Sequence, residues 1–174
     1  MKSNKEIKEL IANLSLDEKI RFCEGADFWS TLPLNDIPSL SMCDGPHGLR
    51  KQIAKNDILG INESVSATCF PAAVTTGSSW DIDLLERIGA AIGKEARSQD
   101  IGMVLGPGAN IKRNPLCGRN FEYFSEDPLF SGKISAAFIR GMQKEGIAAC
   151  LKHFACNNQE KSRYNSNSVV DQRT

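Results

Sequence analysis

The sequence predicts an α/β fold with a parallel sheet, because short apolar segments alternate with longer segments whose apolar residues recur at helical spacing. Residues 37–43, 103–105 and 147–151 are short, apolar and followed by polar loops, so we expect three strands there. Amphipathic segments at 81–96 and 127–146 fill the two intervals between these strands. This order is typical of βαβ units in an open sheet or a closed barrel, and periodicity alone leaves both possible.

Two short helices are expected before the main fold. Leu10, Ile11 and Leu14 form an apolar helical face, and Ser15 follows directly. Ser15 and Glu18 have the spacing of a capping box, in which each residue satisfies a backbone N–H of the other. We therefore expect a second helix to begin at Ser15 and to run toward the apolar residues near position 22.

The two longer helices have recognisable ends and buried faces. Asp81 is suited to the N-cap of the first, whereas Asp127 and Pro128 are suited to the N-cap and first turn of the second. Gly146 is suited to the left-handed position that ends the second helix, and Trp80 is expected in the core. The buried faces are expected to contain Leu85, Ile88, Ile92 and Ala96 in the first helix and Phe130, Ile134, Phe138 and Met142 in the second.

The charge balance excludes several classes of function. Lysines plus arginines and aspartates plus glutamates number 21 each, so no net field attracts nucleic acid or an anionic membrane. The first residues are charged instead of forming the apolar core of a signal peptide, and no apolar run approaches the length of a membrane span. We therefore expect a cytoplasmic protein that acts on a neutral small molecule.

The cysteines are expected to be reduced thiols, because no signal peptide and no dense disulfide framework accompanies them. No Cys-x-x-Cys pair is present, and His47 and His153 are the only histidines. A zinc site therefore has little support, and neither a metal nor another cofactor is expected. The cysteines are Cys23, Cys43, Cys69, Cys117, Cys150 and Cys156.

The chain is short for a complete barrel. An eight-stranded (β/α)8 barrel typically needs about 250 residues, whereas this chain has 174 and opens with two extra helices. Residues 166–174 are polar and leave the last predicted strand without the helix that a parallel crossover requires. If the sheet belongs to a barrel, we expect it to stop inside a βα unit.

Polar residues follow each predicted strand, where functional groups gather in parallel α/β folds. Asp44 follows the first strand, residues 110–119 follow the second, and Lys152 and His153 follow the third. Charged groups of this kind strengthen hydrogen bonds to neutral hydroxyls, which suits a polyhydroxylated ligand. From composition alone, a structural network of ion pairs is about equally favoured.

Four segments resemble those of a known family: Asp44–Arg50, Phe70–Pro71, Gly118–Pro128 and Lys152–Phe154. In order, spacing and length they resemble the signature segments of glycoside hydrolase family 3, and the resemblance covers nearly the whole chain from Leu16 onward. It implies a (β/α)8 TIM-type barrel followed by an α/β sandwich, with a pocket for a terminal sugar at their junction. Residues 1–174 would then be the N-terminal part of an incomplete barrel, with the rest of the barrel and the sandwich absent.

The resemblance also implies the residues that bind the terminal sugar. In that family the equivalents of Asp44, Arg119, Lys152 and His153 bind its hydroxyls. Many members similar to β-glucosidases carry a further sugar-binding arginine after the Lys-His pair, and Arg163 matches it. His47 is not included, because a turn histidine with ordinary local hydrogen bonding is expected there.

No catalytic residue is expected in this chain. The resemblance implies retaining hydrolysis of terminal β-linked glucosyl or related residues, which needs two carboxyl groups about 5–5.5 Å apart. The nucleophilic aspartate and the acid/base glutamate are expected beyond Thr174, so the chain alone is expected to be inactive. Glu122, Glu126 and Asp127 are not expected to replace them. Helix caps and solvated carboxylates are common at such places, and Asp127 is explained as a helix cap. The expected partners are a glycoside or oligosaccharide and the missing C-terminal part of the enzyme.

The segment Lys152–Asn158 resembles the β-glucosidase branch of the family. The N-acetylglucosaminidase branch usually reads Lys-His-Phe-Pro-Gly-His-Gly at this place, and the second histidine of that pattern is missing here. An alternative of another class stays open: the chain could be a non-catalytic carbohydrate-binding or structural remnant of such an enzyme.

Overall fold

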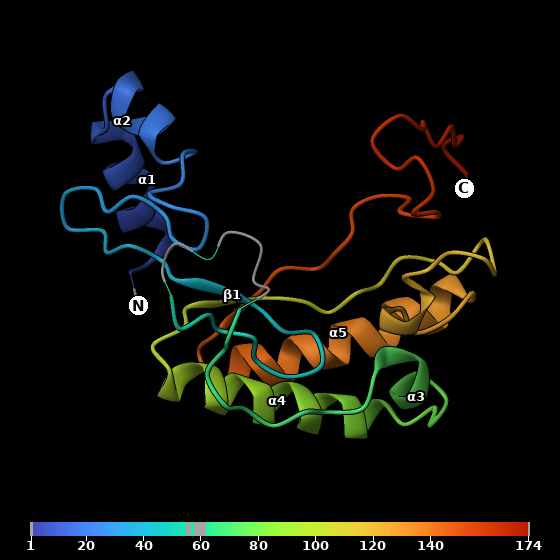
Figure 1. Cartoon of the computed structure of the whole chain (residues 1–174). Helices are drawn as coiled ribbons and strands as arrows, with labels where there is room; N and C mark the ends of the chain where they lie inside the picture. The colour runs from blue at the N-terminus through green and yellow to red at the C-terminus, as the bar shows by residue number, and fades with distance from the viewer. Residues whose placement is uncertain (1, 55–56, 58–61, 174) are drawn as a thin grey trace. The chain divides into compact units, whose positions relative to one another are not determined.

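The computed structural model describes residues 2–54, 57 and 62–173 (Figure 1). The chain divides into two compact units, Met1–Met42 and Cys43–Thr174. Among the described residues, no helix is both long enough and apolar enough to cross a membrane.

The N-terminal unit contains helices α1 (Asn4–Asn13) and α2 (Leu16–Arg21). The predicted capping box at Ser15 is confirmed, because its hydroxyl accepts from the Glu18 N–H while the Glu18 carboxylate accepts from the Ser15 N–H. Ser3 and Glu6 form the same arrangement at the start of α1. Neither helix contains a buried residue, so the caps fix where the helices begin without giving them a core.

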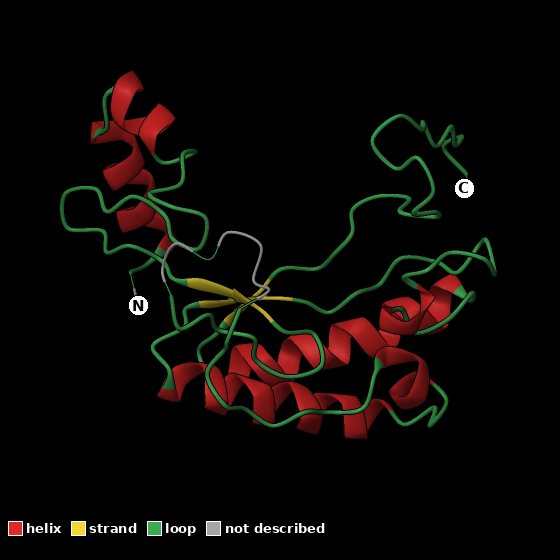
Figure 2. Cartoon of the chain, in the orientation of Figure 1, coloured by secondary structure: helices red, strands yellow, loops and turns green. Residues whose placement is uncertain are grey.

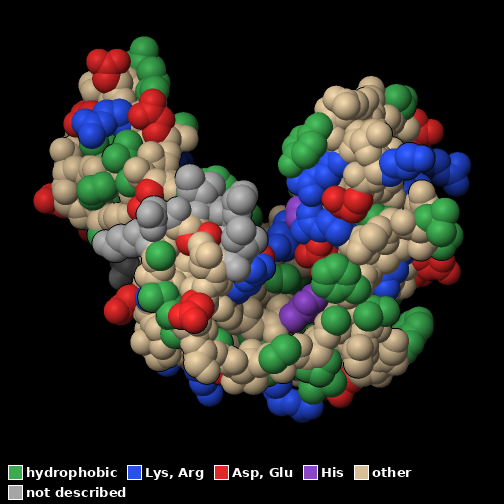
Figure 3. Space-filling view, in the orientation of Figure 1, with side chains coloured by type: hydrophobic (Ala, Val, Ile, Leu, Met, Phe, Trp, Pro, Cys, Tyr) green, Lys and Arg blue, Asp and Glu red, His purple; other side chains and the backbone are tan. Residues whose placement is uncertain are grey.

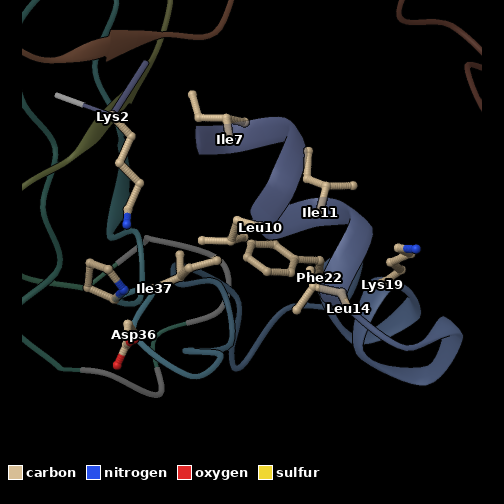
Figure 4. Close-up of a pocket in the computed structure, with 10 residues that line it drawn as sticks. Lys2, Ile7, Leu10, Ile11, Leu14, Lys19, Phe22, Asp36 and Ile37 are labelled. Atoms are coloured by element: carbon tan, nitrogen blue, oxygen red, sulfur yellow. The ribbon is translucent and has the colours of Figure 1, made fainter. Parts of the chain in front are cut away.

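An apolar groove of about 520 Å³ lies within the N-terminal unit (Figure 4). Leu10, Leu14 and Phe22 lie close together along it, and Ile37 lines it from the loop that follows α2. Its remaining lining residues are Lys2, Ile7, Ile11, Lys19, Asp36 and Pro38.

The larger unit is built on a three-stranded sheet in the order β1 (Met42–Asp44), β2 (Met103–Leu105) and β3 (Ala148–Ala149) (Figure 2). Strands β2 and β3 pair in parallel, with Met103 opposite Ala148. Helix α5 (Pro128–Lys144) connects them, which makes a βαβ unit, and helix α4 (Ile82–Ser98) precedes β2. The alternating order and the strand at 103–105 are as predicted.

The first and third strands are shorter than predicted. Residues 37–41 contain Pro38, which has no N–H to donate to a sheet, and the chain there makes an isolated bridge between Leu34 and Ile37. Pairing of the third strand continues only as a bridge between Gly108 and Lys152. Pro107 lies between β2 and that bridge; it has no N–H to donate, and its carbonyl oxygen accepts from the Lys152 N–H at 3.0 Å.

Helices α4 and α5 lie side by side below the sheet and bury its apolar residues (Figure 1). The predicted caps are confirmed, since Asp81 accepts from the Leu84 N–H at 2.9 Å and Asp127 accepts from the Phe130 N–H at 2.6 Å. Gly146 has a φ of +80°, as its place after α5 requires. The fully buried side chains of this core include Leu85, Ile92, Val104, Ile134, Phe138 and Met142.

Two glycines allow the helices to touch. A Cβ at Gly89 of α4 would collide with the Phe138 carbonyl oxygen, and one at Gly141 of α5 would collide with the Glu86 carbonyl oxygen. Any larger residue would push the two backbones apart and open the packing between them.

Trp80 was expected in the core, and this prediction is wrong. Its side chain is 70% exposed, and it stacks on the outer side of the core against Phe130 with ring centroids 4.4 Å apart. Trp80 has a φ of +57° in the tight connection between α3 (Ala73–Gly77) and α4. The turn therefore directs its indole along the surface of α5 instead of inward.

Candidate functional site

The ends of the strands bring together four of the five side chains predicted to bind a sugar. Lys152 Nζ donates to Asp44 Oδ1 at 2.8 Å, although the two residues are 108 positions apart in the sequence. Arg119 Nη2 lies 2.8 Å from His153 Nε2. Asp44 ends β1, Lys152 pairs with Gly108 beyond β2 and β3, and Arg119 directly precedes the short 3-10 helix η1 (Asn120–Glu122).

Glu122 joins these two pairs, and sequence reasoning missed it. Its carboxylate Oε1 accepts from Arg119 Nε, and its Oε2 lies 3.9 Å from Lys152 Nζ. Glu122 is only 5% exposed. A buried carboxylate is costly unless it is paired, so the two cations and Glu122 depend on one another. The only sequence signal was its position three residues after Arg119.

The hydrogen bonds around His153 define its tautomer. A guanidinium can only donate, so His153 Nε2 must accept from Arg119. In a neutral imidazole the other nitrogen then carries the proton, and Nδ1 donates to Tyr123 Oη at 2.8 Å. Tyr123 Oη also accepts from Asn157 Nδ2 at 2.8 Å. Tyr123 and Asn157 therefore hold the ring in one orientation.

Electrostatics support this arrangement. Burial and the nearby positive charge of Arg119 both lower the pKa of His153, which keeps the ring neutral. Burial disfavours the charged form of Arg119, but its hydrogen bond and ion pair with Glu122 outweigh this and raise its pKa. The site thus holds a neutral imidazole against a fixed guanidinium.

Arg163 lies outside the cluster of Asp44, Arg119, Lys152 and His153. Its Nη1 lies 3.3 Å from Glu160 Oε2, and its guanidinium lies 5.5 Å from the centre of the Tyr164 ring. Glu160 in turn accepts from Asn157 Nδ2 at 3.0 Å. Arg163 is thus linked to His153 through Glu160, Asn157 and Tyr123.

His47 makes a long-range hydrogen bond, whereas only local hydrogen bonding within a turn was predicted for it. Its Nε2 accepts from the Ala73 N–H at 3.0 Å, 26 residues later in the chain. Ala73 is the first residue of α3, whose N-cap Ala72 has no side-chain cap, so His47 supplies that cap. Burial lowers the pKa of His47, and only the neutral ring can accept this hydrogen bond.

Charged side chains of both signs lie on the face drawn in Figure 3, and histidine side chains are visible on the same face. Within the described ranges, no group of three or more histidine, cysteine, aspartate or glutamate side chains could hold a metal ion. Glu126 is exposed, and Asp127 is engaged as the cap of α5.

A βαβ sheet with a polar cluster at its strand ends is typical of α/β enzymes with parallel sheets, and comparisons with known proteins define it further. The chain matches the model of the glycosyl hydrolase family 3 N-terminal domain over residues 1–174. The chain therefore belongs to glycoside hydrolase family 3, and its fold is part of the family's N-terminal TIM-type barrel.

Two curated relatives illustrate the range of the family. The chain is 54% identical over 171 residues to thermostable β-glucosidase B of Acetivibrio thermocellus, covering 97% of this chain and 23% of the relative. It is 42% identical over 166 residues to an exo-α-(1→6)-L-arabinopyranosidase of Bifidobacterium longum, covering 94% of this chain and 22% of the relative. The chain thus spans less than a quarter of either relative.

Solved structures show the same fold. The β-glucosidase of Kluyveromyces marxianus matches with a TM-score of 0.87 and 40% identity, over 96% of this chain and 19% of that one. β-Glucosidase 3B of Thermotoga neapolitana, solved in complex with α-D-glucose, matches with a TM-score of 0.79 and 37% identity, over 89% and 24% of the two chains.

Proposed function

We propose that this chain supplies the sugar-binding wall of a retaining glycosidase that hydrolyses terminal β-linked glucosyl residues. The observation that carries the proposal is the convergence of Asp44, Arg119, Lys152 and His153 at the strand ends. The 54% identity to a β-glucosidase supports glucose as the sugar. The 42% identity to an arabinopyranosidase shows that related chains act on other sugars.

The geometry suits binding of neutral hydroxyls. The Asp44 side chain is 35% exposed and can accept from a hydroxyl while it holds Lys152. Lys152 and Arg119 keep donors beyond those used in the cluster, because an ammonium has three and a guanidinium five. Each charge-assisted hydrogen bond to the sugar would contribute about 1.5–3 kcal/mol.

We propose that the catalytic carboxylates belong to a part of the enzyme outside these 174 residues. The relatives are about four times longer than the matched region, since it covers 23% of the first of them. Glu122 is buried between two cations, and Asp127 caps a helix, so both carboxylates have structural partners. Under this proposal the C-terminal part of the same enzyme is the main partner of this chain, which would be inactive alone. A cytoplasmic location is supported by the six unpaired cysteines.

Hydrolysis of 4-nitrophenyl β-D-glucoside tests the proposal. The chain and a version extended to the full length of its relatives would be assayed side by side. We expect activity only in the extended protein. Activity in the short chain would contradict the placement of the catalytic carboxylates, and an extended protein without glycosidase activity would favour a non-catalytic remnant.

A second substrate separates the two sugar specificities. The extended protein would also be assayed on 4-nitrophenyl α-L-arabinopyranoside. We expect a higher kcat/KM for the glucoside, because the more similar relative is a β-glucosidase. The reverse preference would leave the family unchanged and replace glucose as the proposed sugar.

Asp44→Asn tests the sugar-binding wall directly. In the extended protein we expect kcat/KM to fall by a factor that corresponds to about 1.5–3 kcal/mol, because the variant loses charge-assisted bonds that tighten in the transition state. Asp36→Asn, at an exposed position of the N-terminal unit, is the control. Unchanged kinetics of Asp44→Asn would remove Asp44 from the site.

A further inference from the structure

We propose that Glu122 is a positioning residue that holds Arg119 and Lys152 in the orientation needed to bind the sugar. The inference rests on the proposed function, because Arg119 and Lys152 matter to it as sugar-binding groups. It assigns a role to a buried carboxylate that does not itself contact the substrate.

The first argument is the division of its two oxygens. Oε1 accepts from Arg119 Nε and Oε2 faces Lys152 Nζ at 3.9 Å. The Arg119 bond uses Nε and leaves Nη2 directed at His153 Nε2. One carboxylate thus aligns a guanidinium from the loop after β2 with an ammonium from the end of the third strand.

The second argument is the balance of charge. Together with Glu122, the cluster contains two carboxylates, Asp44 and Glu122, and two cations, Arg119 and Lys152, and each cation faces at least one carboxylate. Without Glu122, Lys152 would keep its ion pair with Asp44, whereas Arg119 would lose its ion pair. The Arg119 guanidinium would then turn toward solvent, because an unpaired buried charge is unfavourable.

The third argument is the close packing around the Glu122 backbone. A Cβ at Gly108 would lie 2.5 Å from the Glu122 carbonyl oxygen, so the loop after β2 passes directly against η1. Tyr123, the next residue, is fully buried and holds His153 through its hydroxyl. Adjacent residues therefore hold the cations on one side and the imidazole on the other.

A purely structural ion pair is the competing explanation, and kinetics distinguish it. Loss of a positioning residue weakens sugar binding in every folded molecule, so KM and the inhibition constant for glucose rise. Loss of a structural residue reduces the fraction of folded enzyme, which lowers the maximal rate and leaves KM unchanged.

The test compares Glu122→Gln with Glu126→Gln in the extended protein. Glu126 is an exposed carboxylate four residues later, between η1 and α5, so it controls for the loss of one charge. With 4-nitrophenyl β-D-glucoside we expect Glu122→Gln to lower kcat/KM about 10- to 100-fold and to raise both KM and the glucose inhibition constant. Glu126→Gln is expected to match the unmodified protein.

A double variant tests the link to Arg119. If Glu122 acts through Arg119, Glu122→Gln should lower kcat/KM much less in an Arg119→Lys background than it does alone. If the two residues act independently, their fold-losses in kcat/KM should multiply. A second readout is the nuclear magnetic resonance of the two histidines. Glu122→Gln should shift the His153 ring signals, because Arg119 contacts that ring.

The outcomes separate this inference from the proposed function. An inactive unmodified extended protein would contradict the proposed function. An active one whose Glu122→Gln variant keeps its KM and glucose inhibition constant would overturn only the positioning role. If Glu122→Gln does not fold, Glu122→Asp decides by the same criterion. Its charge is kept, but the shorter side chain cannot face both cations, so a raised KM supports the role and an unchanged KM overturns it.

Discussion

The two units of the chain use apolar residues differently. In the N-terminal unit, α1 and α2 have capping boxes and no buried residue, and Ile11 is 48% exposed. In the larger unit, α4 and α5 bury a continuous core, and Ile92 is fully buried. Helices of 10 and 6 residues are marginal in water without tertiary packing. Well-formed helix ends are therefore no measure of how much an element contributes to stability.

The larger unit also contains the candidate site, and its core explains why the site can be ordered. The strands that end at Asp44 and near Lys152 lie over α4 and α5 (Figure 2). The N-terminal unit offers an open apolar groove instead. Charged side chains that must keep a fixed geometry are thus placed on the unit with the packed core, as binding sites generally require.

The largest expected effect comes from the same substitution made in both units. Ile92→Ala should lower the free energy of unfolding by about 2–5 kcal/mol, because it leaves a cavity in a packed core. Ile11→Ala should change it by less than about 1 kcal/mol, because the side chain is half exposed. Urea unfolding of both variants measures the difference. Equal losses would mean that the N-terminal unit is packed as tightly as the larger one.

A smaller effect is expected from two glycines of α5. Gly141→Ala should lower stability by about 1–3 kcal/mol, because its Cβ collides with the Glu86 carbonyl oxygen on α4. Gly132→Ala in the same helix meets no atom within 4 Å and should raise stability by about 0.5–1 kcal/mol. Thermal unfolding measures both. Stabilisation by both substitutions would show that α4 and α5 are not in close contact.

The smallest effect is expected from pH, and it should be confined to the larger unit. Burial lowers the pKa of both His47 and His153, so in the folded state each binds its proton only below the unfolded value of about 6.5. Between the lowered pKa of the folded state and about 6.5, the unfolded state binds more protons than the folded state, so stability falls as the pH falls. Above about pH 6.5 both histidines are neutral in both states, and the stability that depends on their neutral rings is fully present.

Hydrogen exchange at pH 7.5 and 5.5, corrected for intrinsic rates, locates the effect of pH. Amides of α3, β2 and β3 should lose protection at the lower pH, because His47 caps α3 and His153 lies beyond β3. The N-terminal helices contain no histidine and serve as the internal control. Equal losses in both units would contradict a histidine origin.

Most of the fold could be predicted because its signals are local. The caps Asp81, Asp127 and Ser15 and the end at Gly146 depend on side chains within a few residues of the helix end. Strand lengths were overestimated at 37–43 and 147–151, because an apolar run does not reveal which of its residues find a hydrogen-bonding partner on a neighbouring strand. Trp80 was misplaced because a turn, and not its hydrophobicity, sets its direction.

By itself the sequence determined the alternation of strands and helices, the helix ends and four residues of the cluster, since each has a pattern or motif that can be read along the chain. Only the tertiary structure decided the role of Glu122, the close approach at Gly89 and Gly141, and the long-range bond from His47 to Ala73. These depend on distances between segments far apart in the chain. Such distances follow from packing of the whole unit, and no local pattern encodes them.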